Sequence, residues 1–226
     1  MPQAGTVSID SAGARLVGRL IAPAAPALAV VINAATGVRA SYYHAFAEWL
    51  SRERNAAVLI WDYRDFGASG DARRSHASMT DWGVTDATAA RHWLQGRFPA
   101  LPLWVIGHSL GGNVSLQYAL DHPRDVKSLT LLNPIWVAGD MPAELGSAER
   151  IQAMLANDRQ ALKSILRGVT AMHPEDDNWH RLEAASLKQT DAATWRLPGA
   201  LREWSVVDRL PLLGHIPTLV VRGTGD

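Results

Sequence analysis

One short stretch limits what this chain can fold into more than any other, and it reads VIGHSLGG at residues 105–112. An apolar run, Leu101 to Ile106, leads into it, and an amphipathic run, Asn113 to His122, follows it. A glycine-x-serine-x-glycine pattern between a strand and a helix predicts a sharp turn that exposes the serine in a strained backbone conformation. Glycine is expected on both sides of Ser109 because side chains there would clash with the neighbouring strand and helix.

A turn of this kind has a chemical use. It presents the Ser109 hydroxyl above the carboxyl edge of a sheet, where the hydroxyl can act as a nucleophile. The backbone N–H of Leu110 lies at a helix N-terminus, where free N–H groups and the helix dipole favour negative charge. Leu110 can therefore supply half of an oxyanion hole. The alternative is an ordinary serine in a glycine-rich turn, but the flanking strand, the flanking helix and the additional Gly112 favour the catalytic interpretation.

At these residues the chain resembles the α/β-hydrolase family, and the resemblance covers nearly its whole length. It implies an α/β fold with a doubly wound, mostly parallel sheet and a helical cap insertion, in which the last strand and helix are missing. In this family the loop after an early buried strand supplies the second oxyanion N–H, often from an H-G-x sequence. Here the apolar run Leu28 to Ile32 is followed by Asn33-Ala34-Ala35. By position, the resemblance assigns the second oxyanion-hole N–H to Ala35.

A second segment of the family, D-x-R-G-x-G-x-S, is matched by Asp62 to Ser69, with Asp65 where glycine is usual. The resemblance implies that this segment braces the loop near the nucleophile. Asp62 is therefore not expected to be the catalytic acid.

Strands alternate with helices along the chain, which predicts a parallel sheet with helices on both faces. Residues 1–134 are expected to form the N-terminal part of the hydrolase core, residues 135–213 the helical cap, and residues 214–226 the start of the core's C-terminal part. The predicted cap contains four tryptophans, which either line an apolar acyl pocket or pack the cap onto the sheet. They are Trp136, Trp179, Trp195 and Trp204. The expected strands are 6–10, 15–21, 28–32, 56–61, 101–106, 126–132 and 216–222.

The expected core helices are 41–54, 80 or 81 to 98, and 113–122. Four residues share one face of the first helix, which is expected to face the core; they are Tyr43, Phe46, Ala47 and Leu50. Thr80 or Asp81 is expected to cap the second helix.

In the family, a G-x-x-D sequence after the strand at 216–222 carries the acid of the catalytic triad, and Asp226 matches it. The family order is serine, acid, histidine. All eight histidines lie upstream of Asp226, and none occupies the family position. The sequence therefore resembles an α/β-hydrolase truncated before its general base: either a fragment of a longer gene product, or a natural protein that ends here and is impaired.

Composition argues against several other classes. The 22 basic and 22 acidic residues balance and are scattered, so no basic patch suggests nucleic acid or an anionic membrane as a partner. The absence of cysteine excludes a thiol nucleophile and a thiolate metal site. The apolar stretch Leu20 to Val31 contains two prolines and lacks a signal-peptide cleavage site, so we expect a cytoplasmic protein.

Together these features predict a serine hydrolase that cleaves a carboxylic ester or thioester of a small, largely apolar molecule through an acyl-enzyme. The pattern implies no metal or organic cofactor, and it leaves the oligomeric state open. Two alternatives also stay open: an acyltransferase on the same scaffold, and a non-catalytic protein that binds a ligand beneath the cap.

Overall fold

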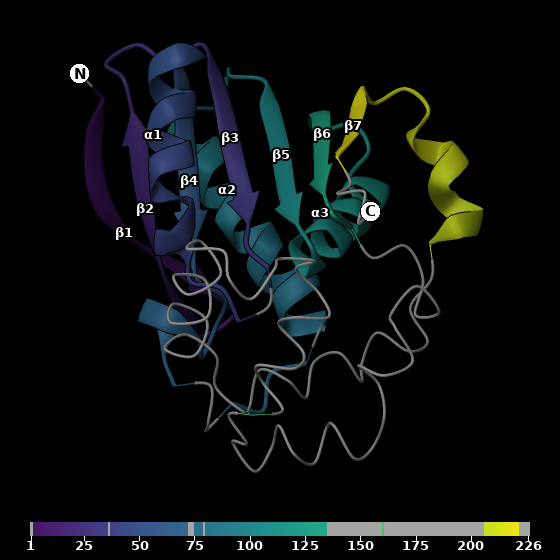
Figure 1. The fold of residues 1–226 in the computed structure, drawn as a ribbon, viewed down its shortest axis with the longest axis horizontal. Helices are drawn as coiled ribbons and strands as arrows, with labels where there is room; N and C mark the ends of the chain where they lie inside the picture. The colour runs from purple at the N-terminus through teal and green to yellow at the C-terminus, as the bar shows by residue number, and fades with distance from the viewer. Residues whose placement is uncertain are drawn as a thin grey trace.

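The computed structural model describes residues 2–35, 37–71, 75–78, 80–134, 160 and 206–221 (Figure 1). Within them, seven strands form one sheet in the order β1-β2-β4-β3-β5-β6-β7. β1 and β2 form an antiparallel hairpin, β2 pairs antiparallel with β4, and the other neighbours are parallel, which confirms the mostly parallel sheet. The strands are β1 (Gln3–Ser11), β2 (Ala14–Ala22), β3 (Leu28–Asn33), β4 (Ala56–Trp61), β5 (Leu103–His108), β6 (Val126–Leu132) and β7 (Thr218–Val221).

The directions of the crossover connections explain why helices cover both faces of the sheet. The chain steps from β3 to β4 on one side, and then from β4 back past β3 to β5 on the other. Right-handed crossovers in opposite directions place the helices α1 (His44–Glu53) and α2 (Ala87–Arg97) on opposite faces. Figure 1 shows α1 in front of the sheet and α2 behind it. The helix after β5, α3 (Leu110–Asp121), continues in the second direction and packs beside α2.

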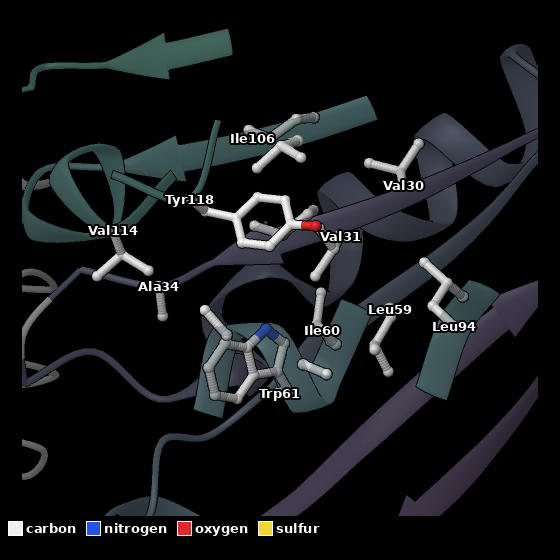
Figure 2. Close-up of a cluster of buried hydrophobic side chains, with 14 of the residues drawn as sticks. Val30, Val31, Ala34, Leu59, Ile60, Trp61, Leu94, Ile106, Val114 and Tyr118 are labelled. Atoms are coloured by element: carbon white, nitrogen blue, oxygen red, sulfur yellow. The ribbon is translucent and has the colours of Figure 1, made fainter. Parts of the chain in front are cut away.

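Strands β3 and β4 form the centre of the core. Every residue of β4 is buried, and in β3 only Leu28 is partly exposed. Such continuous burial is expected for parallel strands that are covered on both faces. Figure 2 shows side chains of both strands in one cluster with Leu94 of α2 and Val114 of α3.

The helix predicted over residues 41–54 consists of a 3-10 turn, η1 (Ala40–Tyr43), followed by α1. The sequence pattern placed Tyr43 and Phe46 on the same buried face. Tyr43 is buried, but the prediction for Phe46 is wrong, because its side chain is 38% exposed and stacks on Trp49 with ring centroids 5.9 Å apart. Within α1, Phe46 lies about 100° around the helix axis from Ala47, at the edge of the buried face, so its ring can turn outward.

The next helical segment begins before the residues predicted to cap it. Thr80 is already helical and makes no side-chain cap hydrogen bond. Instead, Ser78 Oγ accepts the N–H of Asp81 at 3.1 Å, and the Asp81 carboxylate accepts the N–H of Ser78 at 2.7 Å. This reciprocal pair is a capping box, so Ser78 is the N-cap. A π-helical turn, η4 (Asp81–Asp86), then leads into α2.

The predicted cap, residues 135–213, lies outside the described residues except for residue 160 and the segment from Val206 onward. Its four tryptophans are among the residues not described, and the cap boundaries stay predictions. The described end of this segment is a 3-10 helix, η7 (Val207–Leu213), which packs on α3, and Arg209 Nη2 lies 2.9 Å from the Asp121 carboxylate.

No helix in the described part of the chain combines the length and the apolar composition needed to cross a membrane. The cytoplasmic location stays a prediction.

Candidate active site

The turn between β5 and α3 has the geometry expected of an exposed catalytic serine. β5 ends at His108, α3 begins at Leu110, and Ser109 between them has φ 52° and ψ −119°. A serine with positive φ is strained. The Ser109 N–H donates to the carbonyl of Leu132 at 2.8 Å, so the end of β6 holds the turn in place. The strained turn predicted around Ser109 is confirmed.

The two glycines of the motif allow backbone segments to come into direct contact. A Cβ atom at Gly107 would overlap the Gly111 carbonyl oxygen and Ser115 Oγ. At Gly111 it would overlap the carbonyl oxygens of Asn33 and Ala34. The first turn of α3 therefore packs directly on the loop after β3, and this contact brings the two expected halves of the oxyanion hole together.

Gly111→Ala should therefore destabilise the protein. The Cβ would meet two backbone carbonyls, which cannot rotate away, so we expect a loss of roughly 1–3 kcal/mol in the free energy of unfolding, as for other overpacked sites. Gly96→Ala in α2 is the matched control. A Cβ at Gly96 meets nothing within 4 Å, and alanine should stabilise that helix by roughly 0.5–1 kcal/mol. Denaturant unfolding of both variants measures the difference. Equal stabilities would contradict the close contact at Gly111.

Asn33 stands where the family often has histidine, and its side chain has a structural role. It is buried, and its Nδ2 donates to Ser115 Oγ at 2.9 Å while its Oδ1 accepts from Trp61 Nε1 at 3.2 Å. Ser115 Oγ in turn donates to the Gly111 carbonyl at 2.6 Å. The Asn33 amide thus ties together the ends of β3 and β4 and the start of α3.

The next two residues of this loop are held by tyrosine hydroxyls. Tyr63 Oη donates to the Ala34 carbonyl at 3.3 Å. The N–H of Ala35 donates to Tyr43 Oη at 2.9 Å, and the Ala35 carbonyl accepts from the N–H of Val38 at 3.1 Å. The Ala35 N–H, which is proposed as the second donor of the oxyanion hole, therefore already donates a hydrogen bond to Tyr43 in this structure. Nothing in the sequence indicated this bond.

Tyr43 Oη also lies 2.8 Å from Nδ1 of His108, the residue before the candidate nucleophile. Burial raises the pKa of Tyr43 and lowers the pKa of His108, so both groups are neutral near pH 7. Each proton finds an acceptor if the Tyr43 hydroxyl accepts the Ala35 N–H and donates its own proton to Nδ1 of His108. This assignment, made from the hydrogen-bond network, puts the imidazole proton of His108 on Nε2.

A model of the family described as serine aminopeptidase (S33) matches residues 24–226. The chain belongs to the α/β-hydrolase family. Monoglyceride lipase of Rattus norvegicus is 24% identical over 132 residues, which cover 58% of this chain and 42% of that enzyme. The match to a monoglyceride lipase homolog of monkeypox virus also covers 42% of the viral protein, at 24% identity over 52% of this chain. The chain thus aligns with less than half the length of these curated relatives.

Solved structures agree on the fold. A probable hydrolytic enzyme from Pseudomonas aeruginosa is 22% identical with a TM-score of 0.69, and the match covers 99% of this chain and 74% of that one. The enol-lactonase of Burkholderia xenovorans is 17% identical with a TM-score of 0.73, covering 96% and 81%. These likenesses show that the α/β-hydrolase fold extends across the described residues.

The bracing role predicted for Asp62 of this α/β-hydrolase is confirmed. Asp62 is buried, and its two carboxylate oxygens accept the N–H groups of Ala40 at 2.7 Å and Ala68 at 2.9 Å. Ala68 lies in a short 3-10 turn, η2 (Gly67–Ser69), and a Cβ at Gly67 would overlap the Asp62 carboxylate. Asp65 adopts φ 58°, which explains why glycine is usual there.

The structure contains a buried ion pair that was not predicted from the sequence. Asp86 of η4 is fully buried, and its carboxylate accepts from Arg64 Nε at 2.9 Å, Arg64 Nη2 at 2.7 Å and the Arg64 N–H at 2.9 Å. Ser11 Oγ at the end of β1 adds a fourth bond at 2.7 Å. The only sequence signal was the arginine of the D-x-R segment, since nothing in the pattern pointed to Asp86 as its partner.

The remaining site predictions lie partly outside the described residues. Asp226 is not among them, so its assignment as the catalytic acid stays a prediction. His215 precedes β7, and its Nε2 lies 3.1 Å from the carbonyl of Pro123. In the described part of the chain, no three His, Asp or Glu side chains come together in a way that could hold a metal ion.

Proposed function

We propose that this α/β-hydrolase cleaves an ester-like bond, a carboxylic ester or thioester, with Ser109 as the nucleophile. The observation that carries the proposal is the backbone of Ser109. Its positive φ between the end of β5 and the first turn of α3 supports an exposed hydroxyl next to the N–H groups of a helix N-terminus. The named relatives, a lipase and a lactonase among them, support ester chemistry as the first choice.

In the proposed reaction Ser109 Oγ attacks the carbonyl carbon, and its proton passes to a general base. The N–H groups of Leu110 and Ala35 stabilise the oxyanion of the tetrahedral intermediate. Collapse of the intermediate expels the alcohol or thiol, which takes up the proton, and water then hydrolyses the acyl-enzyme by the same route. The family uses a histidine as the base, and we assign Asp226 as the acid that orients it.

The size and polarity of the substrate follow from the predicted cap. Its tryptophans are the reason to propose a small, largely apolar acyl group, since aromatic side chains commonly line apolar pockets.

Covalent labelling tests the nucleophile directly. The full-length gene product should react with a fluorophosphonate probe, and mass spectrometry of peptides should place the adduct on Ser109. A matched Ser128→Ala variant, altered in β6 away from the turn, should label like the wild type. Absence of an adduct on Ser109 would favour a non-catalytic binding protein. Product analysis with a competing alcohol or thiol then distinguishes hydrolysis from acyl transfer.

A further inference from the structure

The phenol of Tyr43 lies between the two segments that form the proposed oxyanion hole. It accepts the N–H of Ala35 from the loop after β3 at 2.9 Å, and it pairs at 2.8 Å with Nδ1 of His108 at the end of β5. Tyr43 is buried at the end of η1, and its ring meets the His108 ring edge-on with centroids 6.0 Å apart. The side chain is thus held on both sides.

This arrangement sets a condition on the proposed mechanism. A backbone amide has one proton, so the Ala35 N–H cannot donate fully to an oxyanion while it donates to Tyr43. A negatively charged oxygen accepts a stronger hydrogen bond than a neutral phenol, so a developing oxyanion can replace Tyr43 as the acceptor of the Ala35 N–H. Breaking the bond between Ala35 and Tyr43 then becomes part of the barrier to acylation.

We propose that Tyr43 is a positioning residue that holds the Ala35 N–H in the resting enzyme and must release it as the oxyanion forms. This inference rests on the proposed function, because it concerns the hydrogen bonding of the same oxyanion hole before the reaction begins. Tyr43 keeps the loop ordered through His108 and at the same time slows the first chemical step. The hydroxyl does not itself contact the reacting oxygen.

Tyr43→Phe tests the proposal because it removes the hydroxyl and keeps the ring. In this variant the Ala35 N–H has no hydrogen bond to a phenol that must break before it can donate to the oxyanion. The free-energy barrier to phosphorylation of Ser109 should therefore be lower. We expect the second-order rate constant for phosphorylation of Ser109 by diethyl p-nitrophenyl phosphate to rise roughly 2- to 10-fold, the factor that corresponds to one neutral hydrogen bond. Release of p-nitrophenolate from the full-length gene product measures this rate.

Tyr42→Phe is the matched control. Tyr42 is the adjacent tyrosine, its side chain is 57% exposed, and it lies in the same 3-10 turn. Loss of its hydroxyl should leave the rate within experimental error. Amide hydrogen exchange at Ala35 provides a second measurement that does not depend on rate. In the wild type this amide should be protected before and after phosphorylation, and in Tyr43→Phe only afterwards.

The outcomes separate this proposal from the one on which it rests. A wild type that labels at Ser109 and a Tyr43→Phe variant that labels at the same rate or more slowly would overturn the role given to Tyr43. A loss of 100-fold or more would show instead that the phenol is a direct oxyanion donor, by analogy with removal of such donors elsewhere. If neither protein labels, the proposed function itself fails, and the inference fails with it. If Tyr43→Phe does not fold, an Ala35 amide resonance of the wild type that is unchanged by phosphorylation overturns the proposal.

Discussion

Ser109→Ala should reduce the turnover of p-nitrophenyl butyrate by the full-length gene product about 10⁶-fold, as loss of the serine from a catalytic triad does elsewhere. The residual rate comes from binding and the oxyanion donors alone, which give roughly 10³- to 10⁴-fold over water. The comparison is made at saturating ester, so that a change in kcat is separated from a change in KM. Turnover near the wild-type value would exclude Ser109 as the nucleophile.

The same substitution should leave the fold intact. Ser109 makes no side-chain cap hydrogen bond to α3, and its strained backbone is held by the bond from its N–H to the Leu132 carbonyl, which alanine retains. The midpoint of thermal unfolding should therefore match that of the wild type. Ser128→Ala serves again as the control and should keep full turnover. A variant that is inactive but also unfolded would not count as support, so both measurements are made on the same sample.

The sequence predicted the central strands well because they are buried on both faces. The strand expected at residues 56–61 agrees with β4 at both ends, since its continuous apolar run has sharp limits where polar residues begin. The strand expected at residues 126–132 also agrees with β6 at both ends, although β6 contains polar residues and is only partly buried. The turn around Ser109 was predictable for a different reason. Gly107 is required by contacts with Gly111 and Ser115 of the helix that follows it, and both the strand and the helix are visible in the sequence. The contact of Gly111 with the loop after β3 depends on the tertiary structure.

Contacts between distant side chains were not predictable in this way. Tyr43 was expected to belong to the core, and nothing in its sequence neighbourhood showed that its hydroxyl meets the Ala35 amide and His108. Phe46 lies at the edge of the buried face of α1, and hydrophobic periodicity does not show which residues at such an edge turn outward. The site therefore divides into a backbone part, which follows from the motif, and a side-chain part, which requires the tertiary structure.

The buried ion pair between Arg64 and Asp86 gives the largest expected effect on stability. Asp86→Ala removes the buried carboxylate that the Arg64 guanidinium binds through Nε and Nη2, and leaves only Asp81 at 3.5 Å beside it. The Arg64 side chain lies beside Ser11 and is 15% exposed. A partly buried charge without its partner is costly, and loss of one partner of such a pair destabilises proteins by about 3–5 kcal/mol. Because Arg64 lies in the loop that Asp62 braces, part of this loss should appear as local opening near the loop before the whole chain unfolds.

Asp81→Ala is the matched control, because Asp81 approaches the same arginine at 3.5 Å but is 37% exposed. Solvent screens this second ion pair, so its loss should lower the free energy of unfolding by at most about 1 kcal/mol. Loss of the capping box with Ser78 should lower it by about 1 kcal/mol more. Urea unfolding of both variants gives the comparison. Asp86→Ala should be less stable than Asp81→Ala by about 1–3 kcal/mol. The reason is that a desolvated guanidinium cannot recover its hydration, whereas Asp81→Ala leaves Arg64 paired with Asp86. Equal losses would mean that water already reaches Arg64 and that the pair braces the loop no more than a surface contact does.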